Sequence, residues 1–216
     1  MSEDSELQKA VLAELNWEPS VNAAHIGVTV ADGVVSLSGR VESLVEKAAA
    51  EAAATRVRGV KAVVDALDVG LPSEAVRPDE AIAAAAAERL AWNAHVPPGA
   101  VTVSVEEGWV TLGGEVDWHY QRLAAVLDVS RLTGVVGITD AIAIRAKPSA
   151  STISDDIMHA LHRSWFFDPK TINVAVEDGV VRLSGQVASP HDRQIAIATA
   201  WSEPGVTDVV SDIVIA

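Results

Sequence analysis

The sequence contains no cysteine, few aromatic residues and few basic ones. Without cysteine, the 216-residue chain can form neither disulfides nor thiolate metal sites. Aromatic residues make up 4% of the chain and most of them are tryptophan, so the cores must be built from Ala, Val, Ile and Leu. Apolar residues reach 49%, which is ample for such cores.

Basic residues are outnumbered, with 16 Lys and Arg against 30 Asp and Glu, and the net charge is −14. The excess is even: −5 over residues 1–72, −4 over 73–147 and −5 over 148–216. No segment forms a basic patch, which argues against nucleic-acid binding. The same charge opposes general attraction to anionic lipid. We interpret the acidity as a contribution to solubility.

Targeting and membrane-spanning segments are also lacking. The first ten residues, MSEDSELQKA, have neither the basic nor the apolar region of a signal peptide. No apolar run approaches the roughly 18 to 20 residues that span a bilayer. We therefore expect a cytoplasmic protein.

A repeated pattern is the main feature that is present. Residues 26–41, 101–116 and 172–187 align as IGVTVADGVVSLSGRV, VTVSVEEGWVTLGGEV and INVAVEDGVVRLSGQV, at offsets of 75 and 71 residues. Each combines two alternating apolar runs with an acidic residue and a glycine between them, which predicts a β-hairpin. The predicted turns are Asp32-Gly33, Glu107-Gly108 and Asp178-Gly179.

Helical patterns flank each hairpin. Apolar residues spaced by three, four and eight precede it, ending at Trp17, Trp92 and Trp165. We interpret these recurrent tryptophans as plugs of the domain cores. A second helix follows, opened by a capping box at Ser43 and Glu46 in the first copy. A Gly-Val pair and a last strand complete each unit, at about 62–69, 137–144 and 208–215.

The sequence thus predicts an α+β protein of three tandem α-β-β-α-β domains, at residues 1–72, 77–147 and 150–216. The linkers at 71–77 and 146–151 are short, so we expect neighbouring domains to touch.

The repeated pattern resembles the BON domain, a family found in osmotic-stress, secretin-associated and haemolysin-like bacterial proteins. The resemblance implies two helices on one face of a small mixed three-stranded sheet, no catalysis and no catalytic residues. It also implies attachment to phospholipid membranes, and one relative suggests binding of potassium in the cytoplasm. The residues that carry it are Gly33, Gly39, Gly59 and Val60; Gly108, Gly114, Gly134 and Val135; and Gly179, Gly185, Gly205 and Val206. Among these we interpret Gly33, Gly39, Gly108, Gly114, Gly179 and Gly185 as structural turn glycines.

Signals for chemistry are weak. No nucleophile elbow or phosphate loop is present, so we expect no enzyme activity and no obligatory cofactor. His159 and His162 lie three residues apart on one predicted helix, but a metal site needs further ligands. Asp65, Asp140 and Ser211 recur on the inward side of the last strand, where a polar group needs hydrogen bonds. A structural hydrogen bond is the favoured interpretation; Asp65 and Asp140 as oxygen ligands of a cation such as K⁺ is the alternative.

The middle copy departs from the others. It has Trp109 where they have valine, and Trp118, His119 and Tyr120 where they begin a helix with serine. Because these changes break local rules in one copy only, we expect a contact surface. It would cover a domain junction, a partner or a lipid interface. The function expected is a non-enzymatic stress- or envelope-associated protein that binds phospholipid or envelope partners. The alternatives are potassium sensing and a protein-interaction or chaperone-like scaffold.

Overall fold

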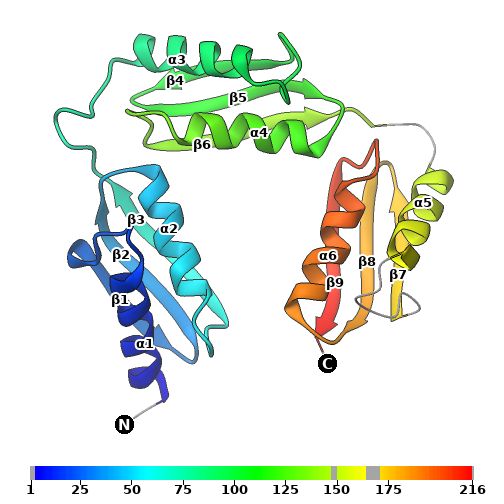
Figure 1. Ribbon diagram of the computed structural model, residues 1–216, viewed down its shortest axis with the longest axis horizontal. Coiled ribbons are helices and arrows are strands. Elements are labelled where there is room, and N and C mark those ends of the chain that lie inside the picture. The colour runs from blue at the N-terminus through cyan, green and yellow to red at the C-terminus, as the bar shows by residue number, and fades with distance from the viewer. Residues whose placement is uncertain (1–2, 147–149, 164–170, 216) are drawn as a thin grey trace. The chain divides into compact units, whose positions relative to one another are not determined.

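The structure, a computed structural model, describes residues 3–146, 150–163 and 171–215, and it repeats one order of elements three times (Figure 1). The first domain contains α1 (Glu3–Trp17), a 3₁₀ turn η1 (Ala23–His25), β1 (Ile26–Ala31), β2 (Val34–Val41), α2 (Leu44–Thr55) and β3 (Ala62–Val69). The second contains α3 (Asp79–Trp92), β4 (Val101–Glu106), β5 (Trp109–Val116), α4 (His119–Ser130) and β6 (Gly137–Ile144). The third contains α5 (Ala150–Arg163), β7 (Ile172–Glu177), β8 (Val180–Val187), α6 (Pro190–Trp201) and β9 (Asp208–Ile215).

Each domain has a three-stranded sheet with its second strand in the centre, in the orders β1-β2-β3, β4-β5-β6 and β7-β8-β9. In the first domain the hairpin is antiparallel, and β3 joins β2 in parallel with Leu37 opposite Asp65. The third domain has the same arrangement, with Leu183 opposite Ser211. The predicted α+β fold of small mixed sheets with helices is confirmed, and the last strands have the predicted bounds.

The hairpin turns follow from their two-residue sequences. Asp32 has a φ of 51° and Gly33 a φ of 81°, and the other two turns repeat these values within a few degrees. Positive φ at both central residues is the geometry of a tight hairpin whose strands keep their natural twist. In the first two domains a carboxylate at the start of the first helix also holds the turn. Asp4 accepts the N–H groups of Asp32 and Gly33 at 3.1 and 3.3 Å, and Asp79 does the same for the second turn.

Gly39, Gly114 and Gly185 were expected in turns, but they lie inside the second strand of each hairpin. A Cβ atom on Gly39 would overlap the carbonyl oxygen of His25, just before β1. The same overlap would occur at Gly114 and Gly185, with Ala100 and Thr171. These glycines are therefore required by close approach of two backbones, at φ values of 110° to 131°.

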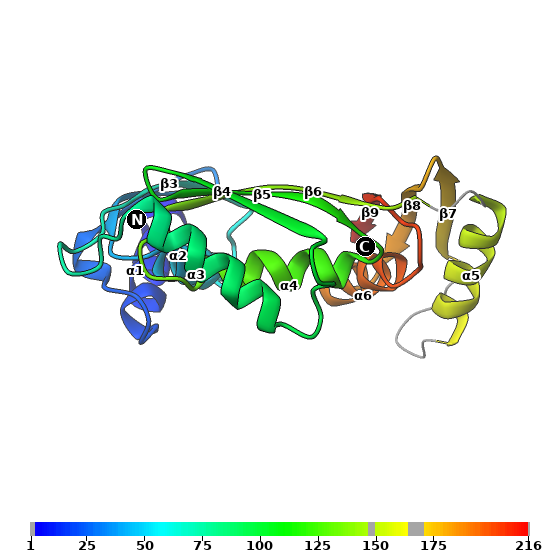
Figure 2. The same ribbon diagram turned by 90° about the horizontal axis from the view of Figure 1, so that it is seen from above.

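The core of the first domain lies between the helices and one face of the sheet. Val11 and Leu15 of α1 pack with Val35 and Leu37 of β2. The helix α2 contributes only small side chains, Ala50, Ala53 and Ala54, which let it approach the sheet closely. Figure 2 shows α3 and α4 on the same side of the strands of the second domain.

The second helices begin as their sequences predict. Ser43 Oγ accepts the N–H of Glu46, and the Glu46 carboxylate accepts the N–H of Glu42 at 2.7 Å, which completes the capping box. In the third domain Ser189 accepts the N–H of Asp192, with Pro190 in the first helical turn. The prediction of these two caps is confirmed.

Candidate binding surfaces

Trp17 and Trp92 are not core residues. Their side chains are 82% and 83% exposed, which overturns the interpretation of these tryptophans as core plugs. The reason lies in the helical period. Each tryptophan follows a buried leucine, Leu15 or Leu90, by two residues. Two residues turn a helix by about 200°, so the indole lies opposite the core.

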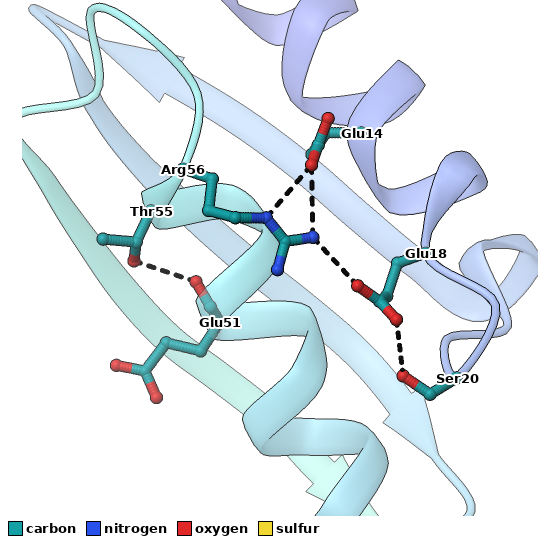
Figure 3. A network of polar contacts seen from close by, with 6 residues as sticks. All are labelled: Glu14, Glu18, Ser20, Glu51, Thr55 and Arg56. Carbon is teal, nitrogen blue, oxygen red and sulfur yellow. Dashed lines mark hydrogen bonds and ion pairs between the residues drawn. The ribbon is translucent and has the colours of Figure 1, made fainter.

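The corner that carries Trp17 is fixed by a polar network (Figure 3). Arg56, at the end of α2, donates to Glu14 at 3.1 Å and to Glu18 at 2.9 Å, and Ser20 donates to Glu18 at 2.9 Å. The hydrogen bond from Arg56 holds the pKa of the Glu18 carboxyl below its ordinary value. Trp17 lies between these two glutamates in sequence, so its backbone is anchored while its indole is exposed.

In the second domain a different ion pair links the two helices at this corner. Arg89 Nε, near the end of α3, lies 3.7 Å from Asp128 Oδ1 of α4. The third domain has Arg163 two residues after its buried Leu161, and Trp165 lies outside the described residues. Exposed tryptophan at this corner is therefore a shared feature of the first two domains.

The candidate cation ligands Asp65 and Asp140 each have a cationic partner. Lys47 Nζ of α2 lies 3.3 Å from Asp65, and Arg122 Nε of α4 lies 2.6 Å from Asp140. Each carboxylate also accepts the backbone N–H two residues along its strand, at 2.9 and 3.1 Å. The geometry is that of a structural ion pair between the second helix and the last strand.

Three of the four aromatic side chains singled out in the middle domain lie around the start of α4. The ring centroids of Trp118 and Tyr120 are 6.2 Å apart, and the ring of His95 meets that of Tyr120 edge-on at 5.9 Å. Partial burial and the charge of Arg122 hold the pKa of His119 below its ordinary value. Gln121 takes the part that Glu46 has in the first domain, because its side-chain oxygen accepts the N–H groups of Asp117 and Trp118 just before the helix.

Sequence reasoning missed the continuation of this aromatic pair along α4. Tyr120, Leu123 and Leu127 are each 51% to 53% exposed. Their spacing of three and four residues places them on one helix face. The sequence signal for this face was three large apolar residues at helical spacing in the middle domain only. The aligned positions are Val45, Ala48 and Ala52 in the first domain, and His191, Gln194 and Ala198 in the third.

Trp109 lies apart from this surface, at the start of β5. Its indole N–H donates to Thr139 Oγ1 of β6 at 2.8 Å, and its side chain is 50% exposed. It lies on the sheet face opposite the buried Val110 and Leu112, as the alternation of the strand predicts. The structure thus does not join all four predicted residues into one surface.

The part of the chain that the structure describes contains no group of three or more His, Asp or Glu side chains arranged to hold a metal ion. His159 is exposed on α5. None of the described helices has the length and apolar character needed to cross a membrane.

Curated proteins and solved structures say little about this chain. No curated protein matches the sequence. Two solved structures of CdsD, a structural protein of the type III secretion system of Chlamydia trachomatis, are 16% identical to this chain, each with a TM-score of 0.28. The alignments cover 98% and 100% of this chain and 92% and 100% of theirs, but similarity at that score supports no conclusion.

The profile of the BON domain, in contrast, matches three times, at residues 3–70, 78–146 and 149–216. These matches span almost the whole chain and fall on the three structural repeats. The chain therefore belongs to the BON domain family, as a tandem of three BON domains.

Proposed function

We propose that this protein is a non-catalytic binding protein that attaches reversibly to phospholipid surfaces through its exposed tryptophans. The observation that carries the proposal is the exposure of Trp17 and Trp92 at the same corner of two domains. Indole is an amphipathic group that favours the boundary between lipid and water. Two such contacts on one chain would act together, because the second binds at a high effective concentration.

The charge of the protein defines the kind of surface. A chain of net charge −14 is repelled by anionic headgroups, so the surface would be electrically neutral, with zwitterionic lipids. Such attachment depends on the indoles and responds weakly to salt. We place this activity in the cytoplasm, in line with the expectation from the sequence.

Flotation with vesicles of phosphatidylcholine tests the proposal. The parent chain should float with the vesicles, and the double variant Trp17→Ala/Trp92→Ala should remain in the dense fraction. The control Val64→Ala/Val76→Ala removes two other exposed apolar side chains and should still float. Flotation of the tryptophan variant at the parent level would contradict the proposal.

A second candidate function is protein interaction through the exposed face of α4, formed by Tyr120, Leu123 and Leu127. Apolar side chains on one helix face are a common protein contact. A partner captured by the parent chain and lost with Leu123→Ala/Leu127→Ala would support this function, whereas equal capture by both proteins would contradict it. Potassium sensing is less favoured, because the ion would have to displace Lys47 and Arg122 from the two aspartates.

A further inference from the structure

The indole of Trp109 forms a fixed aromatic platform on the sheet face opposite the buried Val110 and Leu112. One anchor is the 2.8 Å hydrogen bond from its Nε1 to Thr139 Oγ1. The other is steric, since the six-membered ring lies against Gly137, where a Cβ atom would overlap it. With one face against the backbone and half of the side chain exposed, the ring offers its other face to solvent.

Three coordinated differences build this platform in the middle domain alone. At the positions of Trp109 and Thr139 the first domain has Val34 and Val64, and the third has Val180 and Val210. At the position of Gly137 they have Ala62 and Asp208, which lie directly opposite Val34 and Val180 in the sheets. The fold does not need the tryptophan, because two copies form the same sheet with valine. The middle domain therefore combines a large ring with a glycine that makes room for it and a hydroxyl that orients it. This combination points to a ligand.

The surroundings of the ring indicate the charge of that ligand. Trp109 lines a groove of about 610 Å³ together with Ser104, Thr111 and two acidic residues, Glu106 and Glu107. None of the described residues that line the groove is Lys or Arg. The face of a tryptophan attracts cations, and neighbouring carboxylates add to that attraction. The same carboxylates repel ligands that carry a net negative charge, such as inorganic phosphate.

We propose that the Trp109 groove binds an organic ammonium group, with the cation over the indole face and Glu106 and Glu107 balancing its charge. Choline and its lipid headgroup carry this chemistry. The choice of a lipid headgroup as the natural source rests on the proposed function, whereas ammonium binding itself is measured in water without membranes. A zwitterionic headgroup would give the acidic chain a favourable electrostatic contact that an anionic headgroup cannot.

Titration of the full chain with choline chloride, followed by NMR of the indole N–H signals, tests the site. The Trp109 signal is assigned as the one that Trp109→Val removes, and this variant has the residue of the other two domains. Choline should shift the signal saturably, while sodium chloride at the same ionic strength and 3,3-dimethyl-1-butanol, the neutral analogue, should not. Glu106→Gln/Glu107→Gln should weaken choline binding about tenfold.

Three results would overturn the site: no saturable shift with choline, an equal shift with the neutral analogue, or a response to neutral saccharides instead. The variant Trp17→Ala/Trp92→Ala separates this site from the proposed function. It should bind choline like the parent chain even when it no longer floats with vesicles. Flotation of Trp109→Val with vesicles then identifies the source of the ammonium group. If the variant floats like the parent chain, the ligand is a free ammonium compound. If it floats less than the parent chain, the ligand is the lipid headgroup.

Discussion

Lys47 Nζ lies 3.3 Å from Oδ2 of Asp65, and the same ammonium group donates to the carbonyl of Leu67 at 2.6 Å. Arg122 and Asp140 repeat this link in the second domain at 2.6 Å. The third domain keeps the cation, as Arg193 on α6, but has Ser211 in place of the aspartate. The Ser211 hydroxyl is buried and lacks a hydrogen-bond partner among the described residues.

Replacing Ser211 with Asp should therefore stabilise the third domain. The new carboxylate would face Arg193 and regain the link between helix and strand, worth about 1 kcal/mol for a partly exposed pair. Thermal unfolding of the full chain should show the transition of this domain raised by a few degrees. Ser211→Ala is the control, and Arg193→Ala should remove the gain. A lower transition for Ser211→Asp than for Ser211→Ala would contradict the assignment.

Two glycines of the second domain offer a matched test of the strand geometry. Gly114→Ala should destabilise the domain by about 3 kcal/mol, because its Cβ would overlap the carbonyl of Ala100. Gly99 also has a positive φ, 73°, but no atom lies within 4 Å of the added Cβ. Gly99→Ala should cost only about 1 kcal/mol. Chemical denaturation compares the two variants, and equal losses would show that φ alone explains the need for Gly114.

The repeats, the hairpins and the bounds of the last strands could be predicted because they depend on local patterns: period-two alternation and an acidic-Gly turn. The exposure of Trp17 could also have been predicted, because Trp17 follows the core residue Leu15 by two positions and so lies on the opposite side of the helix. The prediction failed because the hydrophobicity of tryptophan was given more weight than its position on the helix. The partners of Asp65 could not be predicted, because Lys47 reaches it across an unknown helix-to-sheet distance. The position of the Trp109 ring depends on Gly137, a residue 28 positions later that becomes its neighbour only because β6 lies beside β5 in the sheet.

The Glu18 carboxyl should titrate below its ordinary pKa of 4.5, because the hydrogen bond from Arg56 favours its charged form. A lowered pKa in the folded state means that its contribution to stability is present above pH 4.5. That contribution is lost as the pH falls through the folded-state value. Carbon NMR of the side chain measures the pKa directly. Arg56→Gln should return it toward the ordinary value, and an unchanged titration would exclude Arg56 as the cause.

Trp118→Ser tests whether the aromatic start of α4 serves folding. Serine at this position would complete a capping box with Gln121, like the one formed by Ser43 and Glu46. The free energy of unfolding should stay within about 1 kcal/mol of the parent value. A loss of about 3 kcal/mol, typical of a truncated core aromatic residue, would place Trp118 in the core of the domain.

The most direct test of the attachment proposal is the depth of the exposed indoles in a membrane. Vesicles of phosphatidylcholine brominated near the headgroup quench tryptophans that lie at the interface. The fluorescence of the parent chain should fall when such vesicles are added, and that of Trp17→Ala/Trp92→Ala should not, although it keeps four of the six tryptophans. Equal quenching of both proteins, or no quenching of the parent chain, would contradict attachment through Trp17 and Trp92.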